Sequence, residues 1–242
     1  MIKRFFDLIL SFTLLLATLP ILLIFSILIF LQDRHSPFYI AERVGKNEKI
    51  FKLIKFRTMV INADKTGVDS TSANDSRITP LGQMVRKYKI DELPNFINII
   101  LGQMSFVGPR PNVKSETDLY TDEEKLLLSV RPGITDIASI VFSDEGDILS
   151  DSKDPDLDYN QLIRPWKSRL GILYIHKRSL LMDFKLIIYT AAAILSKQTS
   201  LKKINKLLIK INADKKIINV SLRKTDLKPF PPPGSNQIVM SR

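Results

Sequence analysis

The chain of 242 residues contains no cysteine and only two histidines, His35 and His176. Without cysteine there is neither a disulfide framework nor a thiolate metal site. Two histidines are too few for a histidine-based metal cluster. Any bound metal would therefore have oxygen ligands, which favours Mg²⁺ or Ca²⁺ over zinc.

Common nucleotide-binding and nucleic-acid-binding motifs are also missing. The sequence has no Walker loop and no GxGxxG fingerprint, so those modes of nucleotide binding have no support. It has no zinc finger or other compact DNA-reading motif, although its formal net charge is +11. A basic excess suits phosphate-bearing substrates or anionic lipid. With the apolar segment described next, anionic lipid headgroups are the expected partner and nucleic acid is not.

The most informative feature present is a predominantly apolar run of 24 residues, from Leu8 to Leu31, without a charged side chain. A straight helix of that length would measure about 36 Å, enough to cross a hydrocarbon core of about 30 Å. Pro20, near the midpoint, frees the carbonyl of Leu16, which the Thr18 hydroxyl could help to satisfy. If the helix breaks there, each arm measures about 16–18 Å and neither arm crosses.

Two arrangements of this run stay open: a full span with a proline kink, and a re-entrant hairpin that returns to the same face. Basic residues lie on both sides, with Lys3 and Arg4 before the run and Arg34 and Arg43 after it. Basic flanks mark the cytoplasmic side of a membrane, so the re-entrant interpretation explains both flanks. A cleaved signal peptide does not fit, because the run is too long and no small-residue cleavage site follows.

Turn and capping signals predict short strands and helices after the run. Thr79 and Pro80 suit the N-cap and N1 positions of a helix, and Asp91 is the expected N-cap of the next one, which ends at Gly102. Thr121 to Glu124 forms a capping box. The expected elements are strands at 38–41 and 50–56 and helices at 79–88, 91–101, 121–130, 162–174 and 186–195.

The C-terminal part of the chain is strongly basic. Residues 197–228 contain ten Lys or Arg and two Asp, interleaved with Leu and Ile. A membrane-surface arm and a solvated tail both fit this composition. Residues 229–234 are too proline-rich for a helix, and the last dozen residues are expected to be disordered.

Two adjacent carboxylates, Asp91 and Glu92, stand at a predicted helix start just before Pro94. As a structural feature they would be an N-cap and a first-turn acid that matches the helix dipole. As a functional feature, Asp91 would attack a phosphorus while unpaired helix amides stabilise the phosphoryl oxygens. Glu92 could then hold a Mg²⁺ ion that neutralises the transferring group.

Three segments with basic residues are further candidates for the site of the acidic pair. In Pro109-Arg110-Pro111 two prolines fix the backbone around an arginine suited to bidentate phosphate capture, unless the segment is only a turn. Lys55 and Arg57 alternate onto one face at the end of a predicted strand, which could also be a solvated face. Arg131 lies in a predicted turn, where the proline that follows it restricts the backbone.

In order and spacing, these segments resemble the bacterial sugar transferases, the monotopic phosphoglycosyl transferases. The resemblance covers about residues 3–195 and is carried by residues 3–7, 42–45, 55–59, 91–94, 104–111 and 131–135. It implies an α+β, mostly helical fold with an N-terminal re-entrant membrane helix hairpin, a small β-hairpin and amphipathic interfacial helices around a compact cytoplasmic catalytic core. The expected parts are a re-entrant helix (1–36), a catalytic domain (37–196) and a basic, proline-rich tail (197–242).

The resemblance also implies an activity at the bacterial inner membrane. A phospho-sugar would pass from a UDP-sugar to polyprenyl (undecaprenyl) phosphate through a covalent aspartyl intermediate in a ping-pong mechanism. The products would be UMP and a polyprenyl diphosphate sugar that initiates a cell-surface glycan. By this resemblance Asp91 is the nucleophile and Glu92 a Mg²⁺ ligand. The expected substrate-binding residues are Lys55, Arg57, Pro109, Arg110, Pro111 and Arg131.

The chain departs from the family pattern at two places. Leu19 precedes Pro20 where many members have serine, and residues 136–140 read Asp-Ile-Ala-Ser-Ile where many members have Gly-Trp-Ala-Gln-Val. The second departure indicates a different substrate subgroup. The alternative function is a non-catalytic, membrane-anchored lipid-binding or scaffold module, which leaves the acidic pair and the Pro-Arg-Pro segment unexplained. The sugar, the glycan and the oligomeric state, including a homo-oligomer, stay open.

Overall fold

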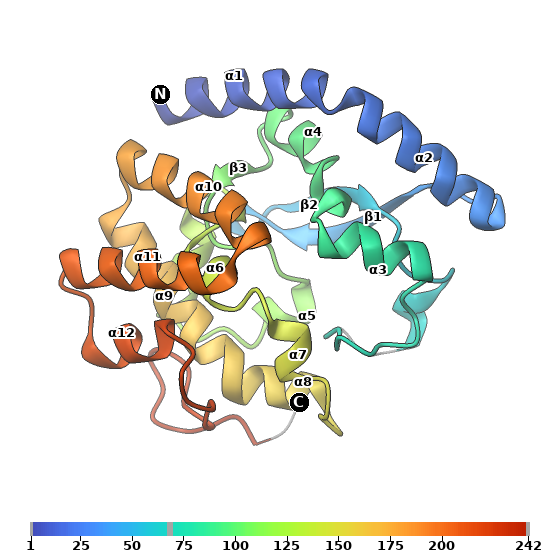
Figure 1. The fold of residues 1–242 in the computed structure, drawn as a ribbon. Helices are drawn as coiled ribbons and strands as arrows, with labels where there is room; N and C mark the ends of the chain where they lie inside the picture. The colour runs from blue at the N-terminus through green and yellow to red at the C-terminus, as the bar shows by residue number, and fades with distance from the viewer. Residues whose placement is uncertain (1, 67–69, 241–242) are drawn as a thin grey trace.

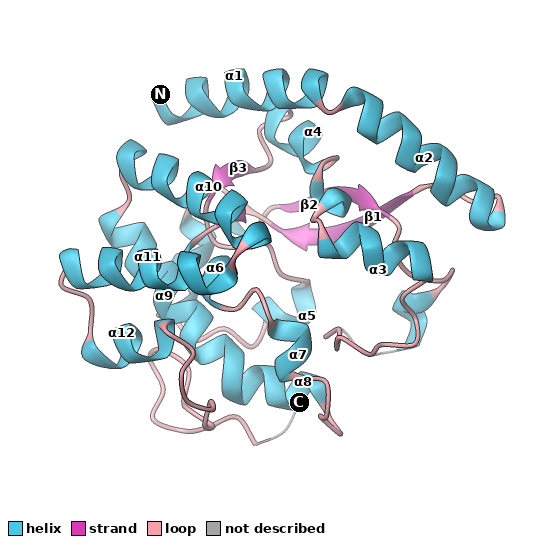
Figure 2. Ribbon diagram, in the orientation of Figure 1, coloured by secondary structure: helices cyan, strands magenta, loops and turns pink. Residues whose placement is uncertain are grey.

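Helices make up most of the computed structural model, which describes residues 2–66 and 70–240 (Figure 1). The strands form a pair of two-stranded sheets between the helices (Figure 2). The expected α+β, mostly helical class is confirmed.

The apolar run forms two helices that meet at Thr18 and bend by 60°. They are α1 (Ile2–Ala17) and α2 (Leu19–Asp33), and Figure 1 shows them as an arc over the rest of the molecule. In the described part of the chain no helix taken alone is long and apolar enough for a bilayer crossing, whereas this bent pair taken together meets both criteria. The Thr18 hydroxyl donates to the Leu14 carbonyl at 2.7 Å and not to that of Leu16, because a threonine in a helix bonds the carbonyl four residues back.

Polar side chains in the first two turns of α1 fasten this helix to the body. Lys3 Nζ donates to the Val107 carbonyl (3.1 Å) and to Asp183 Oδ2 (2.5 Å). Arg4 donates to two carbonyls near the end of α4 (Asn95–Ile100). The buried Asp7 accepts from the Phe106 amide at 3.2 Å. A stripe of apolar side chains at helical spacing stays exposed on α1: Ile2, Phe5, Ile9, Phe12 and Leu16.

A β-hairpin follows α2, as the sequence predicts. Strands β1 (Phe38–Val44) and β2 (Ile50–Phe56) pair antiparallel, with Phe38 opposite Phe56 and their rings stacked 5.4 Å apart. β1 is three residues longer than expected. The turn contains the 3₁₀ segment η1 (Lys46–Glu48).

Helix α3 (Pro80–Lys87) begins where the capping signal predicts. The Thr79 hydroxyl accepts a hydrogen bond from the Gly82 amide at 3.0 Å, and Pro80 occupies the first helical position.

The predicted helix start at Asp91 is wrong. Residues Ile90–Glu92 form a 3₁₀ turn, η3, which follows Lys89 in the left-handed region. Helix α4 begins only at Asn95, with Pro94 at its N-cap, and has six residues. The sequence allows both starts, because a proline without an N–H fits the first turn in either register.

The second sheet joins segments that the sequence shows as separate. Strand β3 (Ser105–Val107) pairs in parallel with β4 (Gly133–Thr135), where only a turn was expected. The backbones approach so closely that a Cβ atom on Gly133 would lie 2.2 Å from the Gly108 nitrogen. This pairing brings the Pro109-Arg110-Pro111 segment beside the residues that follow β4.

The remaining helices surround the main core. They are α5 (Lys114–Thr117), α6 (Ile137–Val141), α7 (Glu145–Ile148), α8 (Pro155–Asp158), α9 (Arg164–Lys177), α10 (Leu180–Leu195), α11 (Lys197–Lys210) and α12 (Lys215–Ser221), with the 3₁₀ segments η2 (Ala63–Thr66) and η4 (Glu124–Ser129) and the π-helical segment η5 (Tyr159–Ile163).

The basic C-terminal part folds onto the body. α11 buries Leu201, Ile204, Leu207 and Leu208 in the main core and presents lysines to solvent. The expected disorder of the last dozen residues is wrong for 231–240, because this segment is tied to the body. The Thr121 hydroxyl donates to the Pro233 carbonyl, and Gln161 donates to that of Val239. The division of the chain into three parts stays a prediction.

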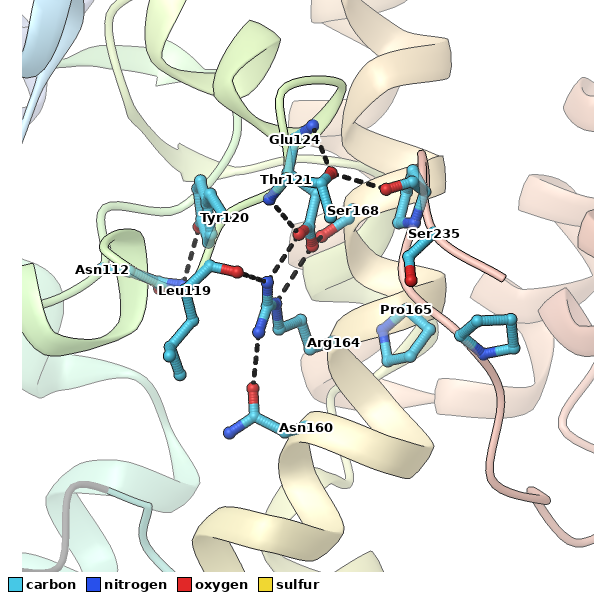
Figure 3. A network of polar contacts seen from close by, with 12 residues as sticks. Asn112, Leu119, Tyr120, Thr121, Glu124, Asn160, Arg164, Pro165, Ser168 and Ser235 are labelled. Atoms are coloured by element: carbon cyan, nitrogen blue, oxygen red, sulfur yellow. Dashed lines mark hydrogen bonds and ion pairs between the residues drawn. The ribbon is translucent and has the colours of Figure 1, made fainter. Parts of the chain in front are cut away.

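A buried charge network joins the start of α9 to the start of η4 (Figure 3). Arg164 donates to both carboxylate oxygens of Glu124, at 3.0 and 2.5 Å, and also to Asn160 and the Leu119 carbonyl. The predicted capping box is present, since Thr121 and Glu124 exchange side-chain-to-amide hydrogen bonds of 3.1 and 3.2 Å. Sequence spacing could not show that Glu124 also pairs with a distant arginine.

Candidate active site

Asp91 is a buried carboxylate with an unsatisfied oxygen. It lies in η3, between α3 and α4, and its Oδ1 atom has no hydrogen-bond partner among the described residues. An unsatisfied buried polar atom costs about 1–3 kcal/mol, so such atoms mark candidate functional sites. Burial, with Glu92 next to it, raises the pKa of Asp91, while Lys55, Lys89 and Arg86 act in the opposite direction.

The amides expected to stabilise phosphoryl oxygens are already in use. The Glu92 amide donates to the Lys89 carbonyl at 3.3 Å, and the Leu93 amide donates to the Ile90 carbonyl at 3.1 Å. Because Asp91 belongs to a 3₁₀ turn and not to a helix N-cap, positive charge near it comes from side chains.

Arg110 and Glu92 form a bidentate ion pair. Nη1 and Nη2 each lie 3.0 Å from a Glu92 oxygen, and Nη1 also donates to the Ile134 carbonyl at 2.8 Å. Burial alone would raise the pKa of Glu92, but Arg110 and Lys89 outweigh it and lower that pKa. Arg110, predicted to bind a phosphate in a bidentate manner, therefore binds the Glu92 carboxylate in that way. A carboxylate and a phosphate present two oxygens to a guanidinium with similar geometry. A guanidinium has five N–H groups, so about two remain for a ligand.

The two prolines around Arg110 fix its backbone beside the second sheet. The Pro109 carbonyl accepts from the Gly133 amide at 3.0 Å, which anchors the segment to β4. Pro111 follows directly. The arginine is therefore presented from a short, pinned turn, and its side chain is 40% exposed.

A basic cavity of about 340 Å³ adjoins the acidic pair. The lining contains five basic residues and one acidic residue, with Phe38, Tyr39 and Phe56 as aromatic neighbours. The charged residues are Arg43, Lys55, Arg57, Arg77, Arg86 and Asp64. Neither Asp91 nor Glu92 is among the described residues that line it. Lys55 and Arg86 connect the two features, since both line the cavity and both act electrostatically on Asp91. Burial, and Arg86 beside it, lower the pKa of Lys55 to about 8.

Arg57 shares the cavity with Lys55, as the strand alternation predicts, but it also makes a structural ion pair. Its Nη1 and Nη2 atoms lie 2.5 and 2.7 Å from the oxygens of Asp33, at the end of α2. Its Nε atom donates to the Ser36 carbonyl. Arg57 thereby ties the apolar helix pair to the β-hairpin at the edge of the cavity.

Arg131 lies apart from the acidic pair. Its Nε atom donates to the Gly102 carbonyl at 2.7 Å, beyond the end of α4, whereas Asp91 precedes the start of that helix. The structure therefore brings together Lys55, Asp91, Glu92 and Arg110, and leaves Arg131 at the other end of α4.

Sequence reasoning missed three charged residues near the site. Arg86 donates to the Thr58 hydroxyl at 2.8 Å, and it acts on Asp91 together with Lys89. Their nearness in the chain to Asp91 was a usable signal. Asp136 begins the segment that departs from the family pattern, but the sequence does not show that β4 brings it toward Arg110. Burial raises the pKa of Asp136, against the hydrogen bonds from Ser139.

The donor set suits a magnesium ion that is shared with a substrate. Within residues 2–66 and 70–240, no group of three or more His, Cys, Asp or Glu side chains is placed to hold a metal. Mg²⁺, however, is usually bound by one or two carboxylates together with substrate phosphates and water. Glu92 keeps a further lone pair on each oxygen beside Arg110, and Asp91 Oδ1 is unsatisfied. The residues present therefore fit the ion.

Comparisons with known proteins agree on one family. A family model described as bacterial sugar transferase matches residues 1–197. The exopolysaccharide production protein ExoY of Sinorhizobium fredii is 37% identical over 153 residues, which cover 57% of this chain and 68% of that protein.

Two longer relatives carry descriptive names. The UDP-N-acetylgalactosamine-undecaprenyl-phosphate N-acetylgalactosaminephosphotransferase of Aeromonas hydrophila is 36% identical over 125 residues, 50% of this chain and 30% of that protein. The undecaprenyl-phosphate galactose phosphotransferase of Salmonella typhimurium is 30% identical over 209 residues, 80% of this chain and 40% of that protein.

Proposed function

The chain belongs to the bacterial sugar transferase family, and from that premise we propose that it transfers a sugar phosphate from a UDP-sugar to undecaprenyl phosphate. The products are UMP and a polyprenyl diphosphate sugar on which a cell-surface glycan is built. Family membership confirms the predicted enzyme class, a sugar-phosphate transferase. The observation that carries the mechanism is the unsatisfied Asp91 oxygen, which lies among cationic side chains and beside an arginine-held glutamate.

The reaction proceeds in two displacements at one phosphorus. Asp91 Oδ1 attacks the β-phosphorus of the donor, and the bond to the bridging oxygen breaks, so UMP leaves with that oxygen and its electron pair. A phosphate oxygen of undecaprenyl phosphate then attacks the same phosphorus. The bond to Asp91 breaks, and the carboxylate is restored.

Side chains of this site supply the positive charge that phosphoryl transfer needs. One of the two remaining N–H groups of Arg110 can donate to a phosphoryl oxygen while Glu92 keeps the guanidinium in place. Lys55 and Arg86 attract the anionic substrate into the basic cavity. Glu92 would hold a Mg²⁺ ion, which would supply charge neutralisation on the diphosphate.

Release of UMP tests this function directly. Purified protein is incubated with a panel of UDP-sugars, with and without undecaprenyl phosphate and Mg²⁺. We expect steady-state UMP release with at least one donor, dependent on both additions. Binding to anionic vesicles without UMP release from any donor would support the alternative, a lipid-binding or scaffold module.

Lys55 gives the proposed activity a particular pH dependence. A lysine is cationic below its pKa and neutral above it, so a pKa of about 8 predicts that UMP release falls as the pH rises through about 8. In Lys55→Arg the guanidinium stays charged, since its pKa is above 12, and the alkaline fall should move beyond about pH 10. An unchanged alkaline limb in the pH–rate profile of this variant would contradict the role given to Lys55.

We place the site at the cytoplasmic surface of the inner membrane, with α1 and α2 as a re-entrant pair. Exposed apolar side chains of α4 and α10 accompany those of α1 and α2, among them Ile97, Leu181 and Phe184. This placement would bring the catalytic pair to the depth of the lipid phosphate. Contact with inner-leaflet anionic lipid, and a homo-oligomer, stay predictions.

Cysteine labelling tests the membrane arrangement, because the chain has no cysteine of its own. Ile2→Cys and Ser36→Cys flank the helix pair. A membrane-impermeant maleimide should label both positions from the cytoplasmic side and neither from outside. Labelling of Ile2→Cys from the outside would instead establish a full span.

A further inference from the structure

A second cavity, of about 40 Å³, shares Arg110 with the candidate active site. Its polar lining includes Asp136, Ser139 and Lys167, and Leu127 and Ala138 add apolar surface. Neither the acidic pair nor the basic cavity accounts for it. Because Arg110 contacts both Glu92 and this cavity, a substrate held at Arg110 would have one of its groups at the cavity's edge.

The size of this cavity limits what can enter. One water needs about 10–15 Å³ of such volume, so about 40 Å³ holds a group of a few atoms. A hexose ring or a nucleobase is too large. The cavity therefore suits a substituent of the substrate, with the ring itself outside.

The lining of this cavity is complementary to an amide that carries a methyl group. The buried Asp136 accepts from the Ser139 amide and hydroxyl through Oδ1, both at 2.6 Å, while Oδ2 has no partner among the described residues. Oδ2 is thus a vacant acceptor, and the unused N–H groups of Arg110 are vacant donors. Ala138 and Leu127 offer an apolar contact. An acetamido group has an N–H, a carbonyl oxygen and a methyl to match these three features, whereas a hydroxyl leaves the apolar wall unfilled.

We propose that this cavity binds the acetamido group of an N-acetylated amino sugar on the donor, so that Asp136, Ala138 and Arg110 determine which sugar is transferred. Asp136 Oδ2 accepts the acetamido N–H, Arg110 donates to its carbonyl, and the methyl packs on Ala138. The inference rests on the proposed function and specifies its donor.

The test compares kcat/KM for UMP release from UDP-N-acetylglucosamine and UDP-N-acetylgalactosamine with kcat/KM for UDP-glucose and UDP-galactose. The wild type should favour at least one N-acetylated donor over its parent hexose by about 100-fold or more, since a site built to bond a group rejects the analogue without it. Asp136→Asn keeps an oxygen for the Ser139 amide but turns an N–H donor toward the substrate. In Asp136→Asn the preference for the N-acetylated donor over its parent hexose should fall at least about tenfold.

The matched control is Asp154→Asn. Asp154 is also a helix N-cap, accepting from the Leu157 amide at 3.1 Å, but it lines neither cavity. It should keep the wild-type preference. If Asp136→Asn fails to fold, Ala138→Leu provides a second route, because it fills the cavity and should abolish the preference, measured as the ratio of kcat/KM for each N-acetylated donor to that for its parent hexose.

Three results would overturn the proposal: a wild type without preference for N-acetylated donors, an equal loss for all donors in Asp136→Asn, or an unchanged preference in Ala138→Leu. If no UDP-sugar released UMP at all, the proposed function would fail, and this proposal with it. The first three outcomes leave the transferase function intact, so the two failures are distinguishable.

Discussion

Replacing Asp91 by asparagine should lower the rate of UMP release by at least about a thousandfold. An amide of the same shape fills the same space but lacks the nucleophilic oxygen anion, so the covalent step is lost while substrate binding remains. The measurement is the initial rate of UMP release by purified Asp91→Asn under saturating donor and acceptor. A rate above about one tenth of the wild-type rate would contradict the nucleophile assignment.

The matched control for this change is Asp122→Asn. Asp122 is exposed and forms an ion pair with Lys125, three residues further along the chain. Asp122 lines neither cavity, so loss of this exposed carboxylate should leave the rate within about twofold of wild type. A large loss in both variants would indicate general damage and would contradict a specific role for Asp91.

Replacing Arg164 by methionine should lower the free energy of unfolding by about 3–5 kcal/mol, because removal of one partner leaves a buried charge uncompensated. Arg164 and Glu124 are both fully buried, and the guanidinium also satisfies Asn160 and the Leu119 carbonyl (Figure 3). Denaturant titration of the detergent-solubilised protein, followed by circular dichroism, measures the loss.

Two further variants make this prediction specific. In the double variant Arg164→Met, Glu124→Gln, neither member of the pair is charged, so part of the lost stability should return. Lys125→Met removes one partner of the exposed Lys125–Asp122 pair and should leave the unfolding midpoint unchanged. Equal effects of Arg164→Met and Lys125→Met would contradict the importance of the buried pair.

The buried pair also bears on the site. Arg164 and Ser168 line the second cavity, and Ser168 donates to Glu124 at 2.7 Å. The network therefore holds one wall of that cavity in position. Thr121, in the capping box with Glu124, also bonds the Pro233 carbonyl, so the C-terminal segment is tied to the same cluster.

Local signals in the sequence were sufficient for the features that depend on neighbouring residues. The Thr79 cap and the capping box of Thr121 and Glu124 arise from contacts within three positions, and the β-hairpin pairs two strands that are adjacent in the chain. The break near Pro20 follows from the chemistry of one residue. These features need no knowledge of the rest of the fold.

Features that depend on distant pairing could not be predicted in this way. The parallel pairing of Ser105 with Gly133 has no periodic pattern, since each strand has three residues. Arg57 and Asp33 are ordinary charged residues until the hairpin meets the end of α2. The sequence predicts a phosphate as the partner of Arg110, because it does not show that the Glu92 carboxylate already pairs with the guanidinium.

The acidic pair itself was selected from the sequence, and its surroundings came from the structure. The motif predicted a helix N-cap with free amides, but η3 uses its amides internally. Positive charge reaches Asp91 from β2, α3 and the turn before η3, through Lys55, Arg86 and Lys89. The chemical role proposed for Asp91 survives this change, because cationic side chains replace helix amides as the source of the field.

The central claim, a covalent aspartyl intermediate, can be tested by direct isolation. The protein is mixed with a UDP-sugar that carries a ³²P label in its β-phosphate, with Mg²⁺ and without lipid, then digested for mass spectrometry. We predict one phospho-sugar on Asp91 and about one equivalent of UMP per protein molecule, followed by loss of the label when undecaprenyl phosphate is added. A protein that stays unlabelled, or releases UMP only once lipid is present, would contradict the account.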